Sequence, residues 1–218
     1  MLFSVNVRDL VLASWETDAE RVARTLPPGL EPAEVDGRHL VTLAALRYQG
    51  GRLGRLPVPP FSQLNVRAYV EWEGEPAVVF LMTRVTAPGM GGALLGAPYR
   101  PARLRVRPGS VQAPGLGVSV PYERKGPRGS GPGALGRHEL GIFEAAGLRA
   151  VRIRRGQAEW EDAAPAGPVR ADPLLALGFD VSSPPELLYA ERAAFEAELP
   201  PRRLAALLDG GPSGEYRP

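Results

Sequence analysis

The sequence predicts a mainly β protein (class α+β): one largely antiparallel sheet that closes on itself or forms a sandwich, with a few short helices. Two observations lead to this prediction. Short segments rich in Val, Leu and aromatic residues recur at close spacing, separated by Gly- and Pro-containing turns. Segments with helical periodicity are few and short. The 218 residues suit one such domain, expected over 1–209, with a flexible tail over 210–218.

The first part of the chain alternates strands with turns. Residues 2–15 predict a strand, because apolar and polar residues alternate at its start and an apolar run follows. A short helix is expected over 19–26, with Thr17 or Asp18 as its N-cap. A second strand over 38–48 follows an Asp-Gly turn.

The clearest element of the chain is a hairpin. Its strands are expected over 63–72 and 77–86, and Glu-Gly-Glu-Pro between them forms the turn. The segment 186–199 fits either a helix or a strand. Further strands are expected over 102–107 and 117–124, a second hairpin over 149–154 and 157–162, and short helices over 138–146 and 172–177, the last capped by Asp172.

The composition is that of an ordinary soluble protein, with 44% hydrophobic residues, 23% charged residues and a net charge of +2. No apolar run reaches the roughly 20 residues of a membrane span, and the N-terminus lacks a signal-peptide pattern. We therefore expect a cytoplasmic protein without a membrane partner. Arginines scattered among acidic residues argue against nucleic-acid binding. Many prolines and no cysteine would suit a heat-tolerant source.

The most informative stretch is residues 61–70. Gln63, Asn65, Arg67 and Tyr69 fall on one side of the predicted strand, and aliphatic residues alternate with them on the other. The aliphatic side must pack on a core. The opposite side is then either a solvated surface or one wall of a polar pocket.

The residues present restrict the chemistry. Only two histidines occur, His39 and His138, and neither has a metal-ligand spacing, so we expect no metal and no cofactor. Cysteine chemistry is excluded because the chain has no cysteine. A Schiff-base enzyme needs an activated lysine. The sole lysine, Lys125, precedes a Gly- and Pro-rich segment that predicts a solvated loop.

Several segments together carry a family resemblance. The most specific are Phe-Ser-Gln-Leu-Asn-Val-Arg-Ala-Tyr-Val at 61–70 and the hairpin strand at 74–81. Leu-Pro-Pro-Gly-Leu at 26–30, Asp-Gly-Arg at 36–38 and Gly-Ala-Pro-Tyr at 96–99 complete the set. On these motifs the chain resembles uncharacterised relatives of acetoacetate decarboxylase, a domain of unknown function within that superfamily.

The resemblance implies a closed, cone-like antiparallel β-barrel whose interior is a small-molecule cavity facing residues 63–69. The decarboxylase uses a lysine pair just ahead of a Gly-x-Pro segment, whereas residues 93–95 here are Ala, Leu and Leu. It also uses a glutamate where this chain has Gln63, which cannot exchange a proton as a carboxylate does. The resemblance therefore implies the scaffold without its Schiff-base chemistry.

Our first functional hypothesis is a barrel that binds a small organic acid, such as a keto or hydroxy acid. Arg67 or Arg84 would pair with the ligand carboxylate. An alternative interpretation is that Arg67 and Asn65 only satisfy buried groups of the fold. The expected ligand-binding residues are Gln63, Asn65, Arg67, Tyr69, Arg84 and Tyr99.

Two other hypotheses stay open. One is a lyase or hydrolase acting on a small acid through Tyr, Arg and a carboxylate, for which Glu71 is the best candidate because it shares the strand face of Gln63. The other is a structural or interaction domain, for example a homodimer formed through an exposed sheet edge.

Overall fold

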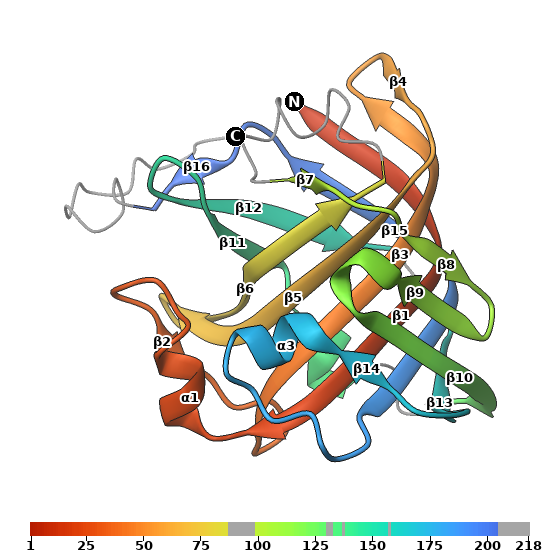
Figure 1. Cartoon of the computed structure of the whole chain (residues 1–218). Coiled ribbons are helices and arrows are strands. Elements are labelled where there is room, and N and C mark those ends of the chain that lie inside the picture. The colour runs from red at the N-terminus through yellow and green to blue at the C-terminus, as the bar shows by residue number, and fades with distance from the viewer. Residues whose placement is uncertain (87–98, 130–132, 137, 157, 205–218) are drawn as a thin grey trace.

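A computed structural model describes residues 1–86, 99–129, 133–136, 138–156 and 158–204 (Figure 1). The Gly-Ala-Pro motif at 96–98 and the expected tail over 210–218 lie outside the described residues. The described part is mainly β, as the sequence predicts.

Strands β1, β3, β5, β6 and β15 are the longest elements. Two α-helices and two short 3-10 helices (Pro114–Leu116 and Gly133–Gly136) complete the described chain. The bounds are β1 Leu2–Thr17, α1 Ala19–Ala23, β2 Glu31–Pro32, β3 His39–Leu53, β4 Leu56–Val58, β5 Phe61–Trp72, β6 Glu75–Val85, β7 Arg100–Pro101, β8 Arg105–Arg107, β9 Ser110–Ala113, β10 Val118–Pro127, β11 Leu140–Glu144, β12 Leu148–Arg155, β13 Trp160–Pro165, β14 Arg170–Ala171, α3 Asp172–Ala176, β15 Glu186–Glu198 and β16 Arg202–Arg203.

The strands form a ring of pairings. Pairing runs from β12 through β11, β6, β5, β3 and β1 to β15, and β15 pairs in turn with β12, where Ile153 lies opposite Ala197. A second arm leaves β15 through β13, β10 and β9 to β8. Most pairings are antiparallel, as predicted, but those of β6 with β11 and with β7 are parallel.

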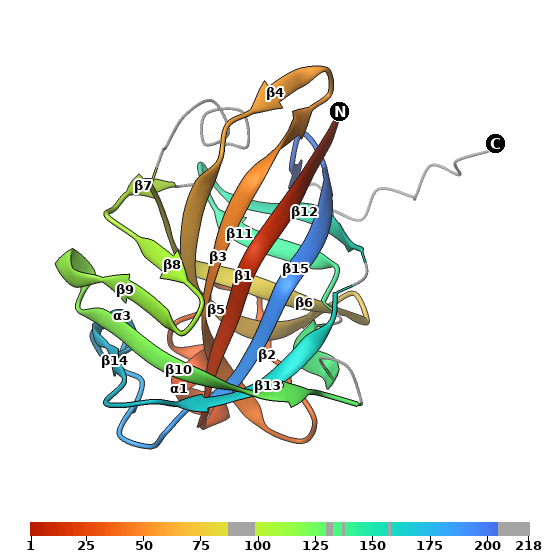
Figure 2. The same cartoon turned by 90° about the vertical axis from the view of Figure 1, so that its right-hand side faces the viewer.

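Strands β1, β3 and β5 are covered on both faces. On one face, Leu64 and Val66 of β5 belong to a core cluster that also contains Val111 and Val120 of the second arm. That arm crosses these strands in Figure 2. On the other face, Tyr69 of β5 belongs to a separate cluster inside the ring. Polar residues in the covered middle of such a strand are buried whichever way they point, so each needs a partner or a function.

The predicted hairpin is confirmed as β5 and β6. Its turn has two central residues, Glu73 and Gly74, with φ angles of 52° and 77°. Positive φ at both positions defines the tight turn that matches the twist of paired strands. Further along, the register slips by one residue, so that Val66 lies opposite Met82 but Arg67 lies opposite Phe80.

Two predictions about the second half are wrong, and one ambiguity is resolved. Residues 138–146 do not form a helix: β11 lies between β6 and β12, and these pairings outweigh helical periodicity. The second hairpin does not form either, since β12 and β13 each pair with β15 and not with one another. The segment 186–199 is this shared partner strand.

The two α-helices of the described chain, α1 and α3, lie close to the positions predicted for them. Asp18 caps α1, and its carboxylate accepts a hydrogen bond from the Arg21 backbone N–H at 2.7 Å. Asp172 is the first residue of α3 and not its cap, because its carboxylate is turned to the guanidinium of Arg170.

Candidate functional site

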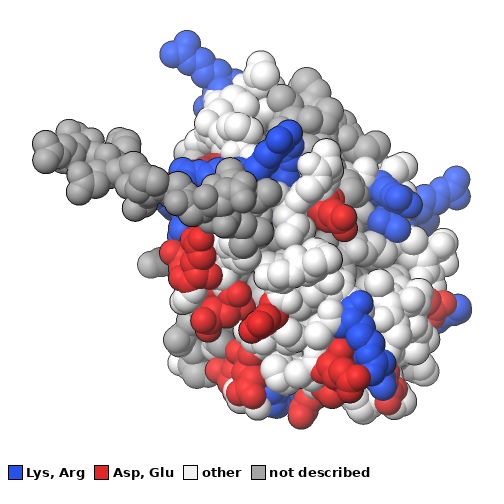
Figure 3. Space-filling model, turned by 90° about the vertical axis from the view of Figure 1, so that its left-hand side faces the viewer, with Lys and Arg blue, Asp and Glu red and all other residues white. Residues whose placement is uncertain are grey.

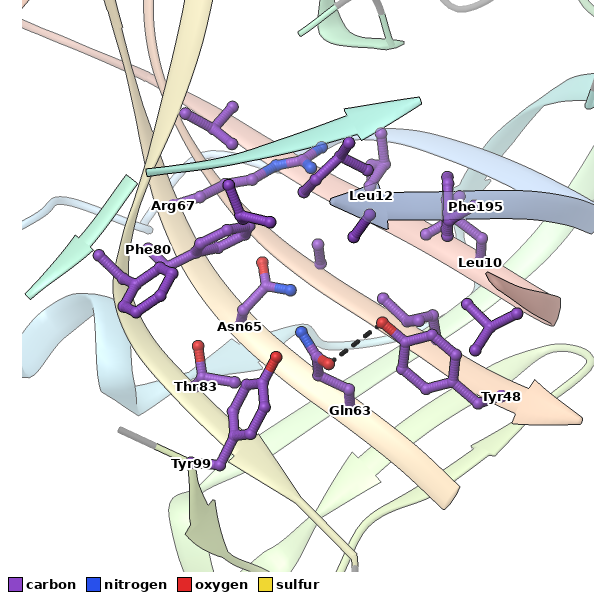
Figure 4. Close-up of a pocket in the computed structure, with 18 of the residues that line it drawn as sticks. Leu10, Leu12, Tyr48, Gln63, Asn65, Arg67, Phe80, Thr83, Tyr99 and Phe195 are labelled. Atoms are coloured by element: carbon purple, nitrogen blue, oxygen red, sulfur yellow. Dashed lines mark hydrogen bonds between the residues drawn. The ribbon is translucent and has the colours of Figure 1, made fainter. Parts of the chain in front are cut away.

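A cavity of about 120 Å³ is lined by side chains from strands around the ring of pairings (Figure 4). Its polar lining residues come from β3, from the β5–β6 hairpin and from the segment just before β7. The remaining lining residues are aliphatic or aromatic. The polar set consists of Tyr48, Gln63, Asn65, Arg67, Thr83 and Tyr99.

One wall of this cavity is the polar face of β5. Gln63, Asn65 and Arg67 line the cavity and are only 6%, 3% and 6% exposed. The alternation along the strand turns Leu64 and Val66 to the other core, so these three side chains must point inward. The polar face is thus a pocket wall and not a solvated surface.

Arg67 is the unusual group of this wall. Its Nε and Nη2 are buried without a hydrogen-bond partner, and no carboxylate among the described residues forms an ion pair with it. The Arg67 charge has one cation–π contact, with the ring of Tyr69, whose centroid lies 5.7 Å from the guanidinium carbon. A buried charge is normally paired, so Arg67 is the lining residue whose charge lacks a counter-ion among the described residues.

The amides beside Arg67 add neutral hydrogen-bonding groups. The hydroxyl of Tyr48 donates to Oε1 of Gln63 at 3.2 Å, so the carbonyl side of this amide is already engaged. Oδ1 of Asn65 is buried without a partner. Thr83 lies opposite Asn65 across the hairpin and adds a hydroxyl to the same wall.

The two cavity tyrosines are neutral donors over a wide pH range. Burial, followed by the neighbouring Tyr99, raises the pKa of Tyr48 above its usual range. Burial raises the pKa of Tyr99 to about 12. Each hydroxyl therefore keeps its proton well above neutral pH and carries no charge that would repel an anion.

These raised pKa values predict alkaline destabilisation. An unfolded tyrosine ionises near pH 10 and the buried ones ionise later, so the folded state holds more protons above pH 10. The free energy of unfolding should then fall by up to about 1.4 kcal/mol per pH unit for each such tyrosine. Urea titrations between pH 8 and 11.5 measure this slope. Tyr48→Phe keeps the ring stacked on Phe61 and removes one ionisable hydroxyl, so the free energy of unfolding should depend less steeply on pH. An unchanged slope in this variant would contradict the attribution of the effect to Tyr48.

Other predicted site residues lie outside this cavity. Tyr69 is 1% exposed, and its hydroxyl is hydrogen-bonded to that of Thr42 at 2.8 Å. Arg84 lies opposite Leu64, away from the cavity, and its Nη1 donates to the Thr83 carbonyl at 3.0 Å. Glu71 is exposed near the far end of β5. The structure thus brings Gln63, Asn65, Arg67 and Tyr99 together in the cavity lining, whereas Tyr69, Arg84 and Glu71 do not line the cavity.

Lys125 and both histidines also lie away from the cavity lining. Lys125 is on β10, and its Nζ donates to Glu123 at 2.8 Å. His138 is buried with its ring tilted against Tyr69, and His39 stands near Glu34 at 4.0 Å. Within the described ranges, no three His, Cys, Asp or Glu side chains gather into a group that could hold a metal ion.

Several charges on the surface are paired with one another. Arg152 donates to Glu75 at 2.9 Å, and Arg154 donates to Glu198 at 3.0 Å. On the face shown in Figure 3, most acidic side chains lie in the lower half and most basic ones in the upper half, with neutral surface between them. Exposed pairs of this kind contribute at most about 1 kcal/mol each, so the informative charges are the buried ones.

In the described part of the chain, no helix has the length and hydropathy of a membrane span.

The ring of strands and its internal cavity define an acetoacetate decarboxylase-like fold. An acetoacetate decarboxylase-like enzyme from Sphingomonas wittichii RW1 superposes with a TM-score of 0.66 over 93% of this chain and 92% of its own, at 14% identity. The enduracididine biosynthesis enzyme MppR, complexed with pyruvate, gives 0.60 over 89% and 88%, at 17% identity. Acetoacetate decarboxylase from Legionella pneumophila subsp. pneumophila str. Philadelphia 1 gives 0.59 over 92% and 85%, at 13% identity.

The family of this chain is established by a sequence match to a family model. Residues 4–139 match the model of DUF2071, described as an uncharacterized conserved protein. No curated protein matches the chain in sequence. This chain belongs to the DUF2071 family, and the resemblance to uncharacterised relatives of acetoacetate decarboxylase is confirmed.

Proposed function

We propose that this protein binds a small organic acid, of the keto or hydroxy acid class, without Schiff-base decarboxylation. The observation that carries the proposal is the buried guanidinium of Arg67 with unpaired Nε and Nη2 beside a cavity. A carboxylate is the natural complement of a guanidinium fork, and removal from water strengthens the pair. Asn65 and Gln63 would bind the keto or hydroxyl oxygen beside that carboxylate.

Two further observations support this proposal. The return of the pairing ladder from β15 to β12 fits a closed, cone-like barrel around the cavity. MppR, which shares the fold, has been seen complexed with pyruvate, a keto acid. At 17% identity this neighbour supports the fold alone, and the choice of ligand rests on Arg67.

The described residues offer no lysine placed for Schiff-base chemistry in the cavity. Covalent catalysis on a keto acid requires a lysine desolvated or activated beside the substrate. Lys125 is half exposed and paired with Glu123 instead. The alternative of a lyase or hydrolase keeps its Tyr and Arg groups but lacks a carboxylate among the described cavity residues, since Glu71 is exposed. A structural or homodimeric role would leave the unpaired Arg67 without a purpose.

Calorimetric titration tests the proposal. Pyruvate, lactate and butyrate should bind to the freshly dialysed protein, and butyramide should bind at least about tenfold more weakly, because it lacks the charge that pairs with Arg67. Equal binding of butyrate and butyramide, or binding of neither, would refute carboxylate recognition. Borohydride reduction in the presence of acetoacetate should leave the protein mass unchanged, and labelling at Lys125 would overturn the non-covalent assignment.

A further inference from the structure

From the distribution of charge and apolar surface in the cavity, we infer that its ligand is a monocarboxylate with an aliphatic body of about four to six carbons. This inference deepens the proposed function and rests on it. It concerns the part of the ligand that Arg67 does not contact.

The charge of the lining sets the ligand charge. Arg67 is the one charged side chain among the described residues that line the cavity. A single carboxylate neutralises it. A second carboxylate would be buried among neutral side chains, where an unpaired charge is strongly disfavoured. The cavity should therefore discriminate against dicarboxylates.

The wall opposite β5 determines the rest of the ligand. Strands β1, β12 and β15 contribute only aliphatic and aromatic side chains to the lining, among them Leu10, Leu12, Val151, Ile153, Phe195 and Ala197. In Figure 4, Arg67 and Phe80 lie on one side of the view and Leu10 and Phe195 on the other, with Asn65 and Gln63 between them. A carboxylate paired with Arg67 would thus direct its chain along an amide-bearing wall and against an apolar one.

The volume limits the length of that chain. About 120 Å³ is somewhat less than the roughly 150 Å³ of an apolar protein cavity known to hold benzene. A straight or branched chain of about four to six carbons fills this space. A two-carbon acid leaves the apolar wall uncovered, and a chain of ten carbons exceeds the cavity.

Competition calorimetry across a series of acids tests the inference. From acetate through butyrate to hexanoate, affinity should rise about fourfold for each methylene that reaches the apolar wall, and decanoate should bind more weakly than hexanoate. Adipate matches hexanoate in length and adds a second carboxylate. It should bind at least about a hundredfold more weakly, because the second charge finds no cation.

Variants of the apolar wall provide the controls. Ala197→Leu fills the cavity and should weaken hexanoate at least tenfold while leaving acetate within twofold. Ala194→Leu, on the other face of β15 beside Gly156, should change neither. Ile153→Ala widens the cavity at a half-buried position and should shift the optimum to longer chains, which keeps the test informative if Ala197→Leu does not fold.

The outcomes separate the two proposals. If no acid binds, the proposed function fails and this inference falls with it. If acetate, hexanoate and adipate bind equally, or if Ala197→Leu weakens acetate as much as hexanoate, the protein binds carboxylates but the inference about the aliphatic body is wrong.

Discussion

Replacing Arg67 by Met should make the ligand-free protein more stable and abolish its binding of carboxylates. Methionine keeps much of the length and apolar volume of arginine and removes the charge. In the wild type, a guanidinium that is 6% exposed has two nitrogens without partners. An unpaired buried charge costs several kcal/mol, part of which the adjoining cavity and the Tyr69 ring offset. We therefore expect a gain of about 2 kcal/mol in the free energy of unfolding.

Urea unfolding with and without butyrate separates the two effects. Butyrate should raise the unfolding midpoint of the wild type and leave that of Arg67→Met unchanged, because only binding to the folded state stabilises it. Arg84→Met is the matched control: it removes an arginine of the same hairpin that lies outside the cavity, so it should keep the response to butyrate. If Arg67→Met unfolds the protein instead, Arg67 serves the fold and the binding hypothesis loses its main support.

Local pattern was sufficient to predict the element that carries the site. Alternation along residues 61–70 defines which side chains share a face, and the turn residues Glu73 and Gly74 close the hairpin. Both signals act over a few residues, so a single sequence contains them. Alternation does not indicate how far along the strand the polar side chains continue to line the cavity. Tyr69 has the same parity as Arg67, yet its hydroxyl is paired with Thr42 from the neighbouring strand.

Long-range pairing explains what the sequence did not predict. Counting back from the two-residue turn places Met82 opposite Asn65. The bulge beside Arg67 shifts the pairing by one residue, so Thr83 lies there instead. The hydroxyl that Thr83 adds to the cavity therefore cannot be predicted from a regular hairpin register. Tyr48 ends the predicted second strand, and only its pairing with Phe61 brings it to Gln63. The apolar wall could not be predicted from local sequence either, because β12 and β15 pair across about forty residues of chain.

Asp9 is a second buried charge, and we expect its removal to lower the free energy of unfolding, whereas removal of the Arg67 charge should raise it. Asp9 is 2% exposed at an irregularity of β1 and is fully partnered. Arg47 Nη2 donates to its Oδ2 at 2.7 Å, and the hydroxyl of Tyr189 donates to its Oδ1 at 3.0 Å. Asp9→Ala would leave a buried tyrosine hydroxyl and a half-buried guanidinium without their acceptor.

We expect Asp9→Ala to lower the free energy of unfolding by about 3 kcal/mol, the order found when one member of a buried polar pair is removed. Part of this loss is conformational, because Asp9 has a φ of 52°, where alanine is disfavoured by about 1 kcal/mol. Asp36 provides the control: it has a φ of 51° and is exposed, so Asp36→Ala should show the conformational loss alone.

The difference between the two variants measures the buried acceptor. Asp9→Asn keeps a side chain that tolerates positive φ and an oxygen that accepts from Tyr189, and loses only the charge opposite Arg47. Its loss in the free energy of unfolding should therefore lie between the losses of Asp36→Ala and Asp9→Ala. Equal losses in Asp9→Ala and Asp36→Ala would mean that backbone conformation accounts for the whole effect. A larger loss at Asp9 would show that β1, β3 and β15 are joined by a buried polar contact which stabilises the fold, the opposite of the effect expected for the unpaired Arg67 inside the same ring.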